Sequence, residues 1–160
     1  MSAKKAPVTK AIRALRDAGA TYTEYLYDYR RYPGALGAAD YIGINPHLTA
    51  KTIVLATNEG NGVIVLMNGD REVSTKTLAR LLGVKETRPA NQKEALAWTG
   101  YQFGGTSPLG LRTKLPVFAQ SDIARLDTTY VNAGSRGFVI GIDPEVLLSL
   151  SNARIVEVAS

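Results

Sequence analysis

The sequence predicts an α/β (α+β) fold, in which a mixed, curled and barrel-like β-sheet of about seven strands is flanked by helices. Short apolar runs rich in β-branched residues predict the strands, and amphipathic segments with clear end signals predict the helices. Hairpins alternate with helical connections, which favours a mixed sheet over a strictly parallel one. Because 160 residues match the size of one domain, we expect residues 1–160 to form a single domain.

The predicted strands are short runs bounded by turn residues. In the first run, Tyr25, Tyr27 and Tyr29 alternate with other residues, which predicts a strand with one aromatic face. The turn at residues 59–62 separates two apolar runs and predicts a hairpin. The candidate strand segments are residues 21–29, 51–56, 63–67, 84–87, 114–119, 128–132, 138–142 and 154–158.

The predicted helices are defined mainly by their ends. Ser74 is a good N-cap, and Asn91 with Glu94 three residues later resembles a capping box. Asp143 precedes Pro144, a residue favoured at the first helical position. The candidate helical segments are residues 7–18, 36–42, 75–82, 92–98, 121–126 and 144–150.

Composition restricts the possible functions. The net charge of +5 fits a polyanionic partner as well as it fits a merely basic protein. The absence of cysteine excludes disulfides, thiolate metal sites and a cysteine nucleophile. The single histidine, His47, is interpreted as a surface loop residue, so we expect neither a catalytic triad nor a metal site. No apolar signal core follows the N-terminus and no apolar run is long enough to span a membrane, which predicts a cytoplasmic protein without a membrane partner.

The stretch from Thr99 to Gly110 contains four glycines and a proline, too many breaks for a helix or a central strand. Glycine allows the backbone to approach a ligand closely, and successive N–H groups in such a loop can bind a carbonyl oxygen or an anion. The stretch matches no phosphate-loop or dinucleotide fingerprint. An ordinary loop between two elements therefore remains an alternative.

Lys51 opens the β-branched apolar run that ends at Ala56. Its ammonium can extend along a sheet edge into solvent, or it can place a charge in a pocket. Together with the glycine loops and several tyrosines, this lysine is what remains after conventional catalytic groups are excluded. Such a set can orient an anionic substrate, stabilise negative charge on a carbonyl oxygen and promote cleavage of a labile ester.

Four sequence elements together resemble the YbaK/ProX family of trans-acting aminoacyl-tRNA editing domains, which is related to the editing insertion of bacterial prolyl-tRNA synthetases. The elements are Lys51-Thr52 at the head of an apolar strand, the segment 99–101, the GGTSPLG segment 104–110, and Tyr130-Val131 leading to the second glycine loop at 134–137. They occur in the order of the family and span most of the chain. The resemblance implies a barrel-like mixed sheet flanked by helices.

The resemblance also implies the site residues. Lys51 matches a lysine important for activity, and Gly104, Gly105 and Ser107 match the loop that positions the aminoacyl carbonyl and the attacking group. We therefore expect these four residues to be catalytic. The residues expected to bind substrate are Tyr27, Thr52, Phe103, Thr106, Pro108, Gly110, Asn132, Gly134 and Arg136. No cofactor or metal is implied.

The implied function is hydrolysis of the ester of mischarged tRNA, with tRNA(Pro) carrying cysteine, alanine or another small amino acid as the substrate. The partner is the acceptor end of aminoacyl-tRNA, and an aminoacyl-tRNA synthetase is a further candidate partner. In cysteine-specific members the thiol of the substrate is thought to attack the ester, whereas alanine-specific members use a positioned water. Asn132 stands where cysteine-specific members tend to have serine, which leaves alanine, serine or threonine open. The alternatives are a non-catalytic tRNA- or nucleotide-binding module and a regulatory relative that acts through protein contacts.

Overall fold

A computed structural model describes residues 5–160 of the chain. The first four residues, on which the expectation of no signal segment partly rests, lie outside the described residues. The helices are α1 (Lys10–Asp17), α2 (Gly34–Ile42), the 3₁₀ helix η1 (Pro46–Leu48), α3 (Thr75–Leu82), α4 (Gln92–Thr99), α5 (Ser121–Ala124) and α6 (Pro144–Leu150). The strands are β1 (Tyr22–Leu26), β2 (Thr49–Thr57), β3 (Gly62–Asn68), β4 (Thr87–Pro89), β5 (Val117–Gln120), β6 (Thr129–Ser135), β7 (Phe138–Ile142) and β8 (Arg154–Val156).

All eight strands form one mixed sheet, which confirms the predicted fold class. The strand order is β1-β7-β6-β2-β3-β5-β8, and β4 pairs with β2 outside this path. The β6–β2, β3–β5 and β5–β8 pairs are parallel, whereas the other pairs are antiparallel. Within the described residues β1 and β8 end the path, so the sheet is open and does not close into a barrel.

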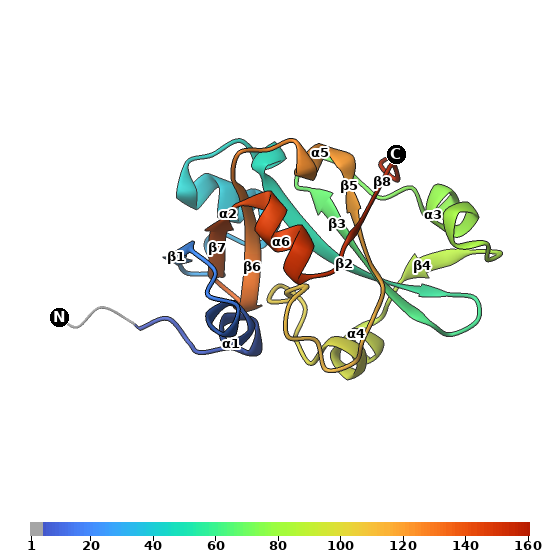
Figure 1. Cartoon of the computed structure of the whole chain (residues 1–160), viewed down its shortest axis with the longest axis horizontal. Coiled ribbons are helices and arrows are strands. Elements are labelled where there is room, and N and C mark those ends of the chain that lie inside the picture. Colours follow the sequence, from blue (N-terminus) through green and yellow to red (C-terminus); the bar gives the residue numbers. More distant parts are fainter. Residues whose placement is uncertain (1–4) are drawn as a thin grey trace.

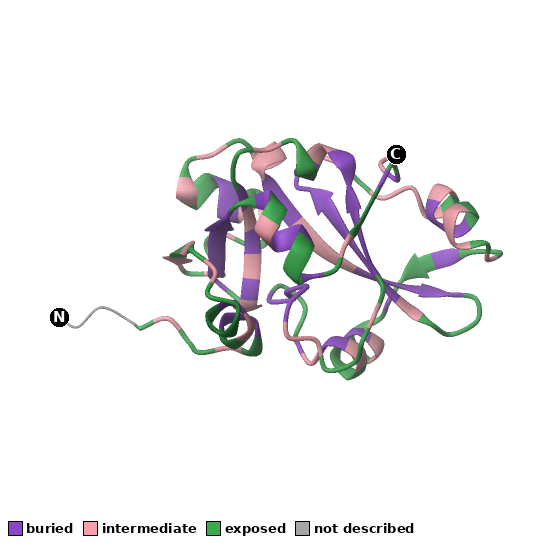
Figure 2. Ribbon diagram, viewed as in Figure 1, coloured by how far each residue is buried: buried purple, intermediate pink, exposed green. Residues whose placement is uncertain are grey.

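Helices cover both faces of the sheet (Figure 1). On one face, Ile12 and Leu15 of α1 and Leu147 of α6 belong to the same buried cluster as Ile64 and Leu66 of β3. Figure 2 shows that buried residues are concentrated along the central strands, whereas the outer turns of the helices are exposed. Burial of apolar side chains at about 25 cal/mol per Å² is the main force that holds these layers together.

The opposite face carries a second, smaller cluster. There Leu78 of α3 packs with Val65 and Met67 of β3 and with Phe118 of β5. Residues of β3 alternate between the two clusters because successive side chains of a strand point to opposite faces. This face also carries α2, which contacts β2 and η1.

Three helix starts predicted from capping residues are confirmed. Ser74 Oγ accepts the N–H of Thr77 at 3.2 Å, and Asp143 Oδ1 accepts the N–H of Glu145 at 2.9 Å. At α4 both halves of the capping box form, since the Asn91 and Glu94 side chains each accept the other's backbone N–H. Local hydrogen bonds of this kind depend only on neighbouring residues, which is why the sequence reveals them.

Three strand predictions are wrong in their bounds. β1 ends at Leu26, so Tyr27 and Tyr29 lie beyond the strand and do not share a sheet face with Tyr25. β4 begins at Thr87, where the predicted strand ends, because its pairing with the end of β2 sets its position. The predicted loop at 133–137 is instead the end of β6 and a tight hairpin, with a register shift between Asn132 and Ser135.

We predict that the capping box makes stability depend on acidic pH. The hydrogen bonds from Arg88 and from the Asn91 backbone lower the pKa of Glu94 to about 2 from its ordinary value of 4.5. A carboxyl whose pKa is lower in the folded state stabilises the fold above its unfolded pKa, and this contribution is lost as the pH falls from about 4.5 toward 2. Thermal unfolding of wild type and Glu94→Gln should therefore differ at pH 6 and converge near pH 2. A difference that stays constant over this pH interval would contradict the assigned cause.

Candidate active site

A cavity of 230 Å³ lies where β2 and β6 part. These two parallel strands pair only through Thr49 with Tyr130 and Ala50 with Val131. Beyond Ala50, this edge of β2 has no strand partner in residues 5–160 until β4 pairs at Leu55. The cavity is lined by Gly34, Ala35, Ala38, Thr49, Ala50, Lys51, Thr52, Gly104, Thr106, Tyr130, Asn132 and Val139.

The glycine loop, residues 104–110, borders this gap and is tied to β6. Asn132 Nδ2 donates to the Gly104 carbonyl at 2.7 Å, and Asn132 Oδ1 accepts the N–H of Gly134 at 3.1 Å. Arg136 Nε donates to the Phe103 carbonyl at 2.7 Å. One asparagine and one arginine from the β6–β7 hairpin therefore fix where the glycine loop lies.

Two glycines of the loop occupy positions that a side chain cannot fill without movement. Gly104 has a φ of +85°, and a Cβ there would lie 2.5 Å from the Tyr29 hydroxyl. A Cβ on Gly105 would lie 3.0 Å from the Arg136 backbone nitrogen and 3.1 Å from the Ser135 carbonyl carbon. The loop thus packs directly against the backbone of the hairpin, as expected of glycine at a close approach.

The glycine loop also contains backbone donors that have no acceptor among residues 5–160. The N–H of Gly105 donates to the Gln102 carbonyl, and the N–H of Leu109 donates to Ser107 Oγ. In the described part of the chain, the N–H groups of Thr106 and Ser107 form no hydrogen bond, although both residues are buried. Because buried backbone donors are nearly always paired, these two groups are candidates for holding a ligand oxygen.

Lys51 and Thr52 project from β2 at the cavity. Lys51 is two residues from Thr49, so both side chains lie on the face of β2 that α2 covers. The Lys51 ammonium donates to the Arg71 carbonyl at 2.6 Å and lies 3.2 Å from Glu72 Oε1. Thr52 Oγ1 is buried without a hydrogen-bond partner among the described residues. Lys51 and Thr52 therefore both border the cavity, but as consecutive strand residues they present the cation and the unpaired hydroxyl on opposite faces of β2.

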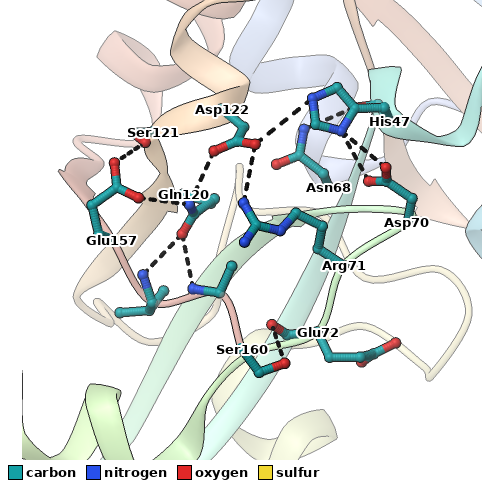
Figure 3. A network of polar contacts seen from close by, with 12 residues as sticks. His47, Asn68, Asp70, Arg71, Glu72, Gln120, Ser121, Asp122, Glu157 and Ser160 are labelled. Atoms are coloured by element: carbon teal, nitrogen blue, oxygen red, sulfur yellow. Dashed lines mark hydrogen bonds and ion pairs between the residues drawn. The ribbon is translucent and has the colours of Figure 1, made fainter.

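A polar network supports the turn that holds Lys51 (Figure 3). His47 Nδ1 lies 3.0 Å from Asp70 Oδ1, and its Nε2 lies 3.8 Å from Asp122 Oδ2. Arg71 donates to Asp122 at 3.1 Å. Hydrogen bonds from Gln120 and then Arg71 lower the pKa of Asp122 below its usual value. The sequence interpretation of His47 as a surface loop residue is corrected, since His47 lies in η1 and is only partly exposed. The sequence could not show its partners because folding brings them together from distant segments.

The cavity brings together five of the residues predicted to form the site, namely Lys51, Thr52, Gly104, Thr106 and Asn132. Gly105, Ser107 and Phe103 adjoin it in the chain without lining it. Pro108 and Gly110 instead line a separate cavity of 720 Å³, and Tyr27 and Arg136 line a cleft of 790 Å³. Gly134 packs against Tyr101, since a Cβ there would lie 2.8 Å from that ring.

Sequence reasoning missed the wall formed by α2 and part of the sheet. Gly34, Ala35 and Ala38 of α2 line the cavity together with Tyr130 and Val139. Small apolar residues carry no chemical signal, and the alanine- and glycine-rich composition of residues 33–43 was the only available indication. Their small size is what leaves space for a ligand between α2 and β2.

The lining residues include neither a carboxylate nor an imidazole. A tyrosine hydroxyl is protonated at neutral pH, and burial raises the pKa of Tyr130 further, so this hydroxyl does not serve as a base. Among residues 5–160 no group of three or more His, Cys, Asp or Glu is placed to hold a metal ion. The chemistry that the lining residues offer is therefore positioning and electrostatic stabilisation.

No helix among residues 5–160 has the length and apolar character needed to cross a membrane.

Fold and site together define an α/β domain with a small pocket at the gap between two splayed parallel strands, equipped to hold a polarised carbonyl group. Residues 35–150 match the family model described as the aminoacyl-tRNA editing domain. The chain belongs to this family. This confirms the predicted family and the predicted class of enzyme, a hydrolase that deacylates aminoacyl-tRNA.

Similar proteins with assigned names agree with this assignment. A protein of Enterococcus faecalis named as a Cys-tRNA(Pro)/Cys-tRNA(Cys) deacylase, EbsC, is 30% identical over 153 residues, which cover 95% of this chain and 93% of the relative. The proline–tRNA ligase of Ligilactobacillus salivarius is 31% identical over 100 residues, which cover 62% of this chain and 17% of that synthetase. A solved structure described as a trans-editing enzyme for prolyl-tRNA synthetase has the same fold, with a TM-score of 0.85, 23% identity and coverage of 98% of this chain and 99% of that one.

Proposed function

We propose that residues 1–160 act as one deacylase domain that removes a small amino acid, such as cysteine or alanine, from mischarged tRNA, with tRNA(Pro) as the principal substrate. The observation that carries the proposal is the small cavity between β2, β6 and the glycine loop. The relatives support the choice of tRNA, since one is named for Cys-tRNA(Pro) and another is a proline–tRNA ligase. The cytoplasm, where tRNA is charged, is the proposed location, and a synthetase is a proposed partner.

The size and lining of the cavity favour a small aminoacyl group. Its volume of 230 Å³ is below the range of about 300–1,000 Å³ that drug-sized ligands occupy. Ala35, Ala38 and Val139 supply apolar surface for a short side chain. Large side chains would be excluded by the walls rather than by specific contacts.

The proposed reaction needs no side-chain nucleophile. A water, or the thiol of a cysteinyl substrate, attacks the aminoacyl carbonyl carbon and forms a tetrahedral oxyanion. The bond from that carbon to the ribose oxygen then breaks, and the ribose oxygen takes up a proton. Attack by water gives the free amino acid and the uncharged tRNA. Attack by the thiol gives the uncharged tRNA and a cyclic thioester, which water then opens to the free amino acid.

The residues around the cavity would promote this reaction by holding the ester and by stabilising the oxyanion. The unpaired N–H groups of Thr106 and Ser107 would stabilise the oxyanion, and Gly105 would keep the loop close enough to the hairpin for them to reach it. Lys51 would lie near the ester and the phosphate of the terminal adenosine. Asn132 holds the loop through the Gly104 carbonyl. Cysteine-specific members tend to have serine at this position, so asparagine here favours a water-dependent reaction on alanine, serine or threonine.

A panel of substrates tests the proposal. The protein is incubated with labelled tRNA(Pro) charged with cysteine, alanine, serine, threonine or proline, and ester loss is followed above the spontaneous rate. We expect faster loss of at least one of the small non-cognate amino acids, and no acceleration for proline. Binding of these tRNAs without accelerated ester loss would overturn the deacylase proposal and favour a non-catalytic binding module.

A further inference from the structure

A second concave surface lies next to the glycine loop, which Tyr29 of its lining contacts at Gly104. This tyrosine cleft has a volume of 790 Å³ and is lined by Lys5, Pro7, Leu26, Tyr27, Asp28, Tyr29, Arg30, Arg136 and Gly137. It combines aromatic rings with positive charge. The charge excess of the whole chain is not used by the small cavity, which has a single cation among its lining residues.

Gly104 and Tyr29 connect the cavity with the tyrosine cleft. Gly104 lines the cavity, Tyr29 lines the cleft, and a Cβ on Gly104 would lie 2.5 Å from the Tyr29 hydroxyl. The Arg136 guanidinium lies 5.5 Å from the centre of the Tyr29 ring and donates to the Phe103 carbonyl. A strand whose terminal ester occupies the cavity reaches the cleft by passing Gly104 and Tyr29.

The charges of the cleft favour an anionic strand. Lys5, Arg30 and Arg136 form no ion pair with a carboxylate in residues 5–160. Asp28 is the one acidic residue in the lining, and its carboxylate accepts the backbone N–H of Arg30 at 3.0 Å. Three unpaired cations against one carboxylate leave the lining with a positive excess, which is suited to contact phosphate groups.

The aromatic rings are held in place before any ligand binds. Tyr27 stacks on Tyr41 with ring centres 5.0 Å apart, and its edge contacts Tyr32 at 6.2 Å. Tyr29 is fixed between Arg136 and Gly104. Fixed rings next to cations are the arrangement on which unpaired bases stack, a contact worth about 1–3 kcal/mol per base in other proteins.

We infer that the tyrosine cleft binds the single-stranded nucleotides immediately 5′ of the terminal adenosine, through stacking on the tyrosines and phosphate contacts to Lys5, Arg30 and Arg136. This inference rests on the proposed function, since the cavity must hold the ester. On this inference the cleft binds the single-stranded RNA, whereas the ester is hydrolysed in the cavity.

The test compares two substrates that carry the same amino acid. One is an aminoacylated RNA minihelix with a single-stranded 3′ end, and the other is the 3′-O-aminoacyl ester of adenosine, which lacks the preceding nucleotides. The variant is Arg30→Glu, because Arg30 is exposed and its side chain forms no ion pair among residues 5–160. The matched control is Arg154→Glu, which changes another exposed arginine, on β8 and outside the cleft.

We expect Arg30→Glu to lower kcat/KM for the minihelix by about tenfold, to weaken its dependence on salt, and to leave the adenosine ester within about twofold of wild type. Arg154→Glu should behave as wild type on both substrates. Equal loss on both substrates, or no loss on the minihelix, would overturn the inference while leaving the deacylase proposal intact. Failure of wild type to hydrolyse either substrate would instead overturn the proposed function.

Discussion

Replacing Gly105 by alanine is expected to lower the single-turnover rate of deacylation by about a hundredfold, whereas the Kd for tRNA should change by less than about threefold. The new Cβ would meet the Arg136 nitrogen at 3.0 Å and the Ser135 carbonyl carbon at 3.1 Å, both of which are backbone atoms. The glycine loop must then move away from the hairpin. Such a shift displaces the N–H groups of Thr106 and Ser107 from the carbonyl oxygen without removing a contact to the tRNA.

The control for this prediction is Gly60→Ala, which also adds a methyl group to a glycine. Gly60 lies in the β2–β3 hairpin with a φ of +83° and open space around it, so the change introduces backbone strain without a clash. It should lower the melting temperature while leaving the rate unchanged. If Gly105→Ala deacylates at the wild-type rate, the proposed role of the loop is wrong.

Replacing Lys51 by alanine is expected to lower kcat/KM by about a hundredfold, the effect of removing one stabilising donor from a developing oxyanion. Lys51 supplies the only ammonium among the residues that line the cavity. In the free protein its ammonium is held by the Arg71 carbonyl and the exposed Glu72, and we expect it to turn from Glu72 toward the ester when substrate binds. Rates for wild type and the variant on the same mischarged tRNA measure the effect.

Glu72→Gln is the matched control for Lys51, since it removes the carboxylate beside the ammonium and leaves the lysine in place. An exposed ion pair of this kind contributes about 0–1 kcal/mol, so stability should hardly change. We expect activity at or slightly above wild type, because the ammonium loses a competing partner. Equal rates for wild type and Lys51→Ala would show that the lysine serves only the turn at residues 70–72.

The elements that the sequence revealed are those specified locally. The caps at Ser74, Asn91 and Asp143 give the helix starts, and the β7 segment 138–142 is bounded by turn residues on both sides. Where pairing with a distant strand sets the bounds of an element, the predicted bounds are displaced from the observed ones. β4 forms only opposite the end of β2, and β1 ends where its partner β7 begins.

The part of the site that could be predicted from the sequence consists of polar side chains and of the glycines in the loop. Lys51, Thr52, Gly104, Thr106 and Asn132 meet at one cavity although they come from three distant segments. The alanines of α2 and the network around His47 were missed, because their roles depend on which segments the fold places side by side. Whether Pro108 and Gly110 contact substrate stays a prediction, since the structure places them at a different cavity.

The most direct test of the central claim observes the backbone amides of the glycine loop. The ¹⁵N-labelled protein is titrated with a non-hydrolysable 3′-amide analogue of alanyl-adenosine, and amide chemical shifts are recorded. We predict that the largest shifts occur at Thr106 and Ser107, accompanied by Thr52 and Asn132 in the same cavity. Saturable binding that shifts residues around the 720 Å³ cavity near Arg112 and Asn152, and leaves Thr106 and Ser107 unmoved, would contradict the assignment of the active site.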